Sequence, residues 1–260
     1  MRSQIATSNK NNRMTNETAN IIEIFPSVQG EGIYVGQRQL FVRFTGCNLG
    51  CNYCDTPIEA QENCKIYDNS GAYREIPNPV SNTTLTEEIG KFDEPVRRRI
   101  SLTGGEPLLY TDFLLNFLDS FRSRFLHTSI YLETNGTLAE NFRQVEPFLD
   151  LIDVVAMDIK LESSTGQPMP IDAHVEFIEA LDDWGGEYFA KLIVTPDIQK
   201  SEIENVKRLL GTAQDEFPLV LQPVSGIEVW QGLMELQDEF LKVITDVRVI
   251  PQVHKLVSLR

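Results

Sequence analysis

Residues 39–54 read QLFVRFTGCNLGCNYC, an apolar strand followed by a short loop that carries three cysteines. The spacing CxxxCxxC brings the thiolates of Cys47, Cys51 and Cys54 onto this one loop. A cubane [4Fe-4S] cluster has four irons, so three protein thiolates leave one iron open to another ligand, whereas an electron carrier normally uses four cysteines. The loop therefore predicts a [4Fe-4S] cluster with one open iron.

A structural zinc site and three unrelated buried cysteines are the alternatives for this loop, because cysteine is often buried without a chemical role. Tetrahedral zinc needs a fourth Cys or His close by. The nearest further cysteine is Cys64, and the histidines are His127, His174 and His254. This distribution favours the open cluster, and we interpret Cys64 as an incidental thiol.

Strand patterns alternate with helical patterns on the carboxyl side of residue 39. Apolar β-rich runs predict strands at 39–44, 98–103, 128–133, 152–160, 187–194 and 217–222, with a short one at 247–250. Apolar residues at three- or four-residue spacing predict helices at about 84–92, 111–122, 141–149, 172–183, 201–210 and 228–243. This alternation predicts an α/β fold with a mainly parallel sheet, either doubly wound or a partial barrel of six βα units.

The length, composition and net charge of the chain favour one cytoplasmic enzyme domain that acts on a small molecule. The net charge of -15 disfavours nucleic-acid partners. The sequence has neither an apolar run of 18 residues nor an apolar segment near its amino terminus, so no membrane span or secretory signal is expected. Residues 1–20 are polar and predict a flexible arm. Residues 21–260 form the expected domain, and 55–82, rich in Asn, Pro and Gly, predict a loop insertion.

Polar motifs stand where several predicted strands end. They are Thr103-Gly104-Gly105-Glu106-Pro107, Glu133-Thr134-Asn135-Gly136, Met157-Asp158-Ile159-Lys160 and Gln222-Pro223. Strand ends converge on one face of a barrel-like fold, so these motifs are expected to meet. Each also has a simpler interpretation, because GGEP fits an ordinary turn and the others fit solvated strand ends.

The cysteine loop followed by GGEP resembles the radical S-adenosylmethionine (SAM) superfamily. The resemblance implies a partial (β/α)6 barrel in which SAM occupies the open iron and is cleaved reductively to a 5′-deoxyadenosyl radical that abstracts hydrogen from the substrate. Carried onto this sequence, it implies SAM contacts at Tyr53, Cys54, Asp55, Gly105, Glu106, Glu133, Asn135, Asp158, Ile159, Lys160 and Gln222.

The segment before the cysteine loop carries polar residues that indicate which kind of ligand is bound. Gln29 and Glu31 offer donor and acceptor groups on a glycine-flanked loop, and Arg43 is a charged residue within an apolar strand. A buried arginine needs an anionic partner, which is either a ligand or a structural ion pair.

This segment, SVQGEG followed by FVRFTGCNLGCNYCDT, resembles the 7-carboxy-7-deazaguanine synthase family of queuosine and deazapurine biosynthesis, from about residue 23 to 56. The resemblance implies a ring contraction that converts 6-carboxy-5,6,7,8-tetrahydropterin to 7-carboxy-7-deazaguanine with loss of ammonia. Thr56 would ligate Mg²⁺, and Arg43 would pair with the substrate carboxylate. The implied pterin contacts are Val28, Gln29, Gly30, Glu31, Arg43, Thr103 and His254.

The family resemblance also implies a homodimer and an electron donor such as a flavodoxin. The sequence departs from the family pattern in its amino-terminal extension, its longer segment after Thr56 and its ending in Leu259-Arg260, so no contact is assigned to Arg260. The competing hypotheses are another radical SAM enzyme, such as a glycyl-radical activase, and a non-catalytic iron–sulfur or zinc protein.

Overall fold

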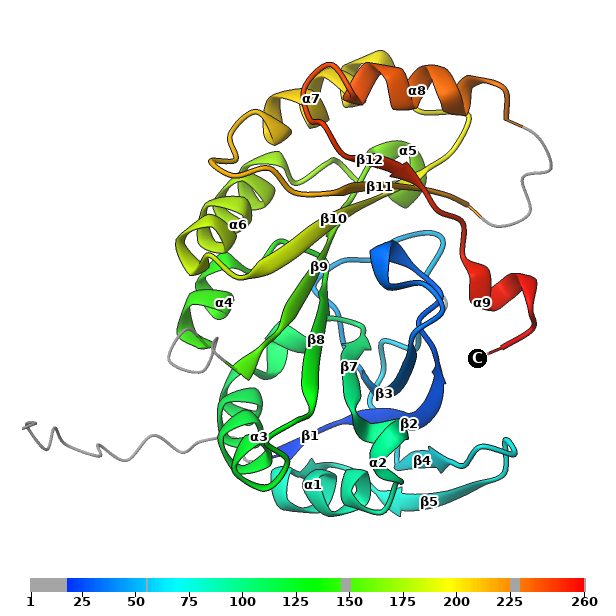
Figure 1. Ribbon diagram of the computed structural model, residues 1–260, viewed down its shortest axis with the longest axis vertical. Coiled ribbons are helices and arrows are strands. Elements are labelled where there is room, and N and C mark those ends of the chain that lie inside the picture. The colour runs from blue at the N-terminus through cyan, green and yellow to red at the C-terminus, as the bar shows by residue number, and fades with distance from the viewer. Residues whose placement is uncertain (1–17, 55, 146–150, 225–229, 260) are drawn as a thin grey trace, which may run out of the picture.

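The computed structural model describes residues 18–54, 56–145, 151–224 and 230–259, in which strands and helices alternate along most of the chain (Figure 1). The strands are β1 (Thr18–Ala19), β2 (Ile21–Val28), β3 (Arg38–Phe44), β4 (Asn63–Tyr67), β5 (Tyr73–Pro77), β6 (Val80–Ser81), β7 (Arg99–Gly104), β8 (Ser129–Thr134), β9 (Val154–Ile159), β10 (Glu187–Val194), β11 (Leu219–Pro223) and β12 (Val247–Val249). The α-helices are α1 (Asn82–Gly90), α2 (Glu94–Arg97), α3 (Thr111–Arg124), α4 (Ala139–Val145), α5 (Glu162–Thr165), α6 (Ile171–Trp184), α7 (Lys200–Leu210), α8 (Gly232–Phe240) and α9 (Val253–Leu256). Short 3-10 turns are η1 (Gly32–Tyr34) and η2 (Pro107–Tyr110). Within these ranges no helix has the length and apolar character that crossing a membrane requires.

The main sheet has the strand order β12-β11-β10-β9-β8-β7-β3-β2-β4-β5. From β3 to β12 the neighbouring strands are parallel and follow one another in chain order. A doubly wound sheet would reverse its order and carry helices on both faces. Here Figure 1 shows an open, curved fan of strands with α3, α4, α6 and α7 along its outer side. The predicted α/β fold is therefore present as a partial barrel.

The seven predicted strands all occur, each within two residues of its expected ends. The predicted helices also occur, although 141–149 and 228–243 extend into residues that the structure does not describe. β2 was not predicted. It pairs antiparallel with β3 and carries the glycine-flanked loop at its carboxyl end.

The predicted loop insertion at 55–82 is wrong for most of its length, because β4 and β5 form a hairpin that extends the sheet beyond β2. β4 alternates buried and half-exposed side chains, whereas β5 is largely exposed, which hid the strand pattern in a polar sequence. At the turn, the Asp68 carboxylate accepts hydrogen bonds from the backbone N–H groups of Ser70 and Ala72 at 2.8 and 3.2 Å. Cys64, on β4, is fully buried in the core.

The predicted arm ends earlier than expected. Residues 1–17 lie outside the described ranges, but Thr18 and Ala19 form β1, which pairs antiparallel with β6. Ala19 is buried, and Asn20 exchanges hydrogen bonds with the backbone of Gln61 at 2.9 and 3.1 Å. These residues attach the start of the domain to β6, with which β1 forms a separate two-stranded sheet, and to the segment before β4.

The two faces of the sheet are filled differently. On the outer side, Phe113, Phe117 and Phe121 of α3 are fully buried, and each such side chain contributes about 1.5–3 kcal/mol to stability. On the inner side, Tyr131 and Phe189 pack with residues of η1 in a smaller cluster. Because this cluster fills the amino-terminal part of the barrel, the carboxyl ends of the strands are left to border a cavity.

Candidate active site

The inner rows of the strands change from apolar to polar toward their carboxyl ends. On β9, Val154 and Ala156 join the aromatic cluster, and the next residue in that row is Asp158. On β10, Phe189 is followed in the same way by Lys191. Side chains two apart on a strand share a face, so one edge of the sheet collects the polar groups. These groups are Thr103, Glu133, Asp158, Lys191 and Gln222.

Two adjoining cavities lie at this edge. The larger, of about 280 Å³, is bordered by the three loop cysteines and is called the cysteine chamber. The smaller, of about 120 Å³, is bordered by the loop after β2 and is called the glycine-loop chamber. Five residues border both and form the wall between them: Glu31, Arg43, Thr103, Glu133 and Gln252.

The structure brings together most of the residues predicted from sequence. The cysteine chamber is bordered by Cys47, Cys51, Tyr53, Cys54, Thr56, Gly105, Glu133, Asn135, Asp158, Lys160 and Gln222. The glycine-loop chamber is bordered by Val28, Gln29, Gly30, Glu31, Arg43, Thr103 and His254. Glu106 and Ile159 are fully buried and border neither, and Asp55 lies outside the described residues.

The cysteine loop is held from its far side. The backbone N–H of Asn52 donates to the Thr165 carbonyl at 2.9 Å, and that of Gly50 donates to the Gln167 side chain at 3.3 Å. The three loop thiols are free, and burial raises the pKa of Cys51, as does the negative charge of the neighbouring cysteines. Bound iron reverses this effect because a coordinating thiol is deprotonated. Within the described ranges no three ligating side chains are placed as they would be around a single metal ion, so the fit to a cluster with an open iron rests on the donor set: three thiols on one anchored loop.

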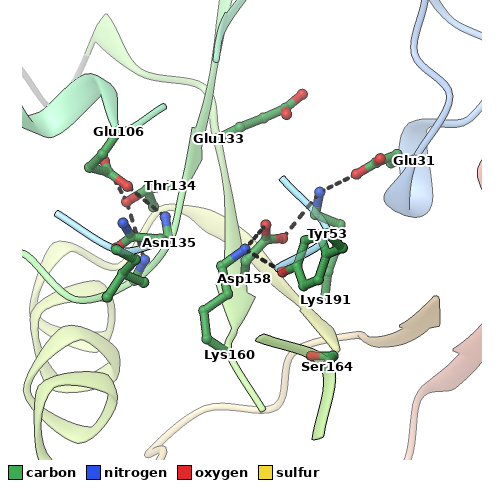
Figure 2. Close-up of polar contacts among 12 residues, drawn as sticks. Glu31, Tyr53, Glu106, Glu133, Thr134, Asn135, Asp158, Lys160, Ser164 and Lys191 are labelled. Carbon is green, nitrogen blue, oxygen red and sulfur yellow. Dashed lines mark hydrogen bonds and ion pairs between the residues drawn. The ribbon is translucent and has the colours of Figure 1, made fainter. Parts of the chain in front are cut away.

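Glu106 does not occupy the position expected of a SAM ligand. Its carboxylate accepts hydrogen bonds from the backbone N–H of Leu108 at 3.0 Å, from the Thr134 hydroxyl at 2.9 Å and from the backbone N–H of Asn135 at 2.7 Å (Figure 2). Burial nevertheless raises its pKa to about 7. The side chain of Asn135 in turn donates to Cys47 Sγ at 3.6 Å. Glu106 therefore positions the end of β8 against the cysteine loop.

A row of alternating charges runs along the chamber floor. Figure 2 shows Lys191 between Glu31 and Asp158, with Nζ–O distances of 2.5 and 3.1 Å. Asp158 also pairs with Lys160 at 2.8 Å, and the Lys160 ammonium donates to the Tyr53 hydroxyl at 3.1 Å. Although burial opposes ionisation, the two lysines lower the pKa of Asp158 to about 2. The row therefore carries fixed charges at neutral pH.

Arg43 and Glu133 are a cation and a carboxylate in the wall between the chambers. Arg43 Nε donates to Glu23 at 2.9 Å, and its guanidinium lies over the ring of Phe25, 5.4 Å from the centroid. Glu133 Oε1 accepts from the side chains of Gln29 at 2.9 Å and Ser101 at 3.0 Å, and Oε2 accepts from Thr103 at 2.8 Å. Both of these charged side chains border both chambers. The sequence had assigned Glu133 to SAM alone.

Two polar residues that contact Glu31 were not predicted. Lys191 has a signal in the sequence, because it is a charged residue within the apolar strand 187–194, as Arg43 is within 39–44. Gln252 has none, since its side chain reaches Glu31 at 2.5 Å only after the chain has returned from β12. His254, in contrast, was predicted and lies against Gly30.

Comparison with known proteins agrees with this geometry. A sequence family described as a 4Fe-4S single cluster domain matches residues 28–173. The 7-carboxy-7-deazaguanine synthase of Geobacter sulfurreducens is 37% identical over 254 residues, covering 93% of this chain and 98% of the relative. The synthase of Methanothermobacter thermautotrophicus is 38% identical, with the same coverage of 93% and 98%.

Among solved structures, the crystal structure of QueE from Escherichia coli superposes with a TM-score of 0.57 at 22% identity, covering 91% of this chain and 95% of that one. At this identity the likeness concerns the fold, and it confirms the predicted partial barrel. The identity to the two synthases extends over 93% of the chain. The chain therefore belongs to the 7-carboxy-7-deazaguanine synthase family.

Proposed function

We propose that this protein converts 6-carboxy-5,6,7,8-tetrahydropterin to 7-carboxy-7-deazaguanine and ammonia by radical SAM chemistry. The single observation that supports this most directly is the shared wall: the chamber of the three cysteines adjoins a chamber bordered by Arg43, a partner for a carboxylate. A reaction that starts with hydrogen abstraction needs its radical source and its substrate at such close range.

The residues of the cysteine chamber fit a [4Fe-4S] cluster and SAM. Cys47, Cys51 and Cys54 supply three thiolates. Gln222 Oε1 is a buried acceptor without a hydrogen-bond partner in the described parts of the chain, which suits a donor group of a bound ligand. When bound, cluster and SAM supply a carbon radical that abstracts hydrogen. The protein's part is to hold the ligand: Lys160, paired with Asp158, provides positive charge near the position expected for the SAM carboxylate.

The glycine-loop chamber fits a carboxylated pterin. Arg43 would pair with the carboxylate. Glu133 Oε2, which accepts from Thr103, can accept a second hydrogen bond from a ring N–H group because a carboxylate oxygen has two lone pairs. Val28, Gln29, Gly30 and Thr103 would border the ring, with His254 closing the chamber. Thr56 borders the cysteine chamber, as Arg43 does, and we propose that its hydroxyl ligates Mg²⁺ there together with substrate oxygens.

The two competing hypotheses have less support. A glycyl-radical activase or a non-catalytic iron–sulfur or zinc protein shares the cysteine loop but needs no second chamber with Arg43. Identity to the synthases over 93% of the chain favours the ring contraction. The homodimer and the flavodoxin-like donor are proposals that rest on the family resemblance. The single domain over residues 21–260 is a proposal that rests on the length and composition of the chain.

The decisive experiment is anaerobic turnover of the reconstituted protein with reductant, SAM and 6-carboxytetrahydropterin, followed by mass spectrometry. We expect one deazapurine and one ammonia per substrate consumed, and faster turnover with Mg²⁺. Thr56→Ala should lose the Mg²⁺ stimulation while keeping the cluster. Formation of 5′-deoxyadenosine without any deazapurine would refute the assigned substrate but leave the enzyme class.

A further inference from the structure

Lys191 borders the cysteine chamber and contacts Glu31, one of the residues of the wall between the two chambers. It belongs to β10, is 3% exposed, and pairs in sheet register with Asp158 of β9. Its ammonium contacts Asp158 Oδ1 at 3.1 Å on the cysteine-chamber side. It also contacts Glu31 Oε2 at 2.5 Å on the loop that borders the other chamber. One buried cation therefore ties a loop to the sheet.

Burying this cation is costly unless it is well paired, so its position calls for an explanation. Without Lys191, the carboxylates of Glu31 and Asp158 would face each other in a buried site and repel. Burial acts to lower the pKa of Lys191, but the negative charges of Asp158 and Glu31 outweigh it and raise the pKa well above its usual value. The same ammonium keeps the pKa of Glu31 low despite burial.

The contacts of Glu31 show what the tie holds in place. Its second carboxylate oxygen accepts from Gln252 at 2.5 Å, and its backbone N–H donates to the Gln29 side chain at 3.1 Å. The Gly30 carbonyl accepts from the backbone N–H of Val253 at 2.9 Å. The glycine loop and the segment after β12 thus form one unit, and Lys191 is the charged link between this unit and the strand that carries Asp158.

We infer that Lys191 is a positioning residue that sets the distance between the substrate held by the glycine loop and SAM held at the end of β9. This inference rests on the proposed function. Transfer of a hydrogen atom needs reacting atoms within about 3–3.5 Å, and a displacement of about 1 Å can cost about 100-fold in rate. Loosening the loop should therefore separate SAM cleavage from product formation.

The test compares Lys191→Met with the wild-type holoenzyme, measuring deazapurine formed per 5′-deoxyadenosine, the KM for the pterin and SAM affinity. In the variant we expect the coupling ratio to fall at least fivefold and the pterin KM to rise at least tenfold. SAM affinity should change less than threefold, because Asp158 keeps its pair with Lys160. The SAM-dependent change in the electron paramagnetic resonance spectrum of the reduced cluster should persist.

Two further variants keep the inference testable if Lys191→Met does not fold. Glu31→Gln cuts the same link from the loop side while leaving Lys191 paired with Asp158, and it should show the same loss of coupling. In the double variant the pterin KM should be no higher than in the worse single variant, because both changes break one contact. Lys242→Met, at an ammonium on the surface, is the matched control and should behave as wild type.

The outcomes distinguish failure of the positioning role of Lys191 from failure of the proposed function. A wild-type protein that makes deazapurine, with variants whose coupling ratio stays at the wild-type value, would overturn the role of Lys191 alone. Loss of SAM binding in parallel with pterin binding would likewise overturn it, since it would show a general structural role. A wild-type protein that cleaves SAM without making deazapurine would overturn the proposed function and, with it, this assignment.

Discussion

Replacing Arg43 with Met should weaken substrate binding while leaving the cluster intact. Among the described residues the guanidinium donates one hydrogen bond, from Nε to Glu23, so its terminal nitrogens are available to a carboxylate. The Met side chain keeps an aliphatic stem of similar length but loses the guanidinium that lies over Phe25. The change therefore removes mainly the charged donors.

The size of the effect follows from the position of the side chain. A hydrogen bond to a charged group contributes about 1.5–3 kcal/mol, and a carboxylate can accept two from one guanidinium. The Arg43 side chain is 25% exposed, so solvent screening reduces the sum. We expect a loss of about 2–4 kcal/mol, which is about a 30-fold to 700-fold rise in the pterin KM.

The assay is steady-state turnover at varied pterin and saturating SAM, with iron content and SAM binding measured on the same samples. Arg43→Lys should recover part of the affinity, because it keeps the charge but not the paired donors. Glu23→Gln breaks the ion pair from the other side and should raise KM less than about fivefold, since hydrogen bonds to a still-charged Arg43 are retained. If Glu23→Gln and Arg43→Met raise KM equally, or if Arg43→Met loses iron, Arg43 is a structural residue and the reasoning is refuted.

Two other predictions concern the cysteines and Glu106. Cys51→Ala should abolish cluster assembly, measured as bound iron and sulfide. Cys64→Ala should retain the cluster because Cys64 is buried on β4. Equal loss of iron in the two variants would contradict the assignment of the cluster ligands. Since folding raises the Glu106 pKa from 4.5 to about 7, the folded protein keeps a proton that the unfolded chain loses between these values, and stability from this group falls as pH rises through that window. Glu106→Gln removes this dependence. Between pH 5 and 8 the unfolding free energy of the variant, relative to that of the wild type, should therefore rise by about 3 kcal/mol, or roughly 6–12 °C in melting temperature. If the difference between the two proteins stays constant over this pH range, Glu106 is ionised throughout.

Most of the barrel could be predicted because its strands are buried on both faces and its helices are amphipathic. The hairpin of β4 and β5 could not, because β5 has an exposed, polar sequence and is held by backbone pairing with β4. Residue propensities therefore predict a strand poorly where backbone pairing with a neighbouring strand, rather than burial of its side chains, stabilises it. β2 is mostly buried and was missed for a different reason: it contains Pro26 and leads directly into a glycine-rich loop, which together suggest irregular structure.

The sequence predicted which residues meet at the site better than it predicted the role of each residue. Strand-end motifs indicated which residues converge, because parallel strands deliver their ends to one edge. The role of Glu106 was wrong as a direct ligand, since its three hydrogen-bond donors come from the ends of η2 and β8, which only the fold brings together. Lys191 was missed although the reasoning applied to Arg43 would have found it.

The contact between Gly30 and His254 links two distant positions in the evolution of this chain. Gly30 does not adopt a positive φ, so backbone conformation does not require glycine there. A Cβ at this position would lie 1.9 Å from His254 Nδ1, so any other residue there requires the imidazole to move. Substitution of His254 by a smaller residue would remove this contact, so we expect related sequences to carry a residue other than glycine at position 30 mainly where position 254 is smaller than histidine.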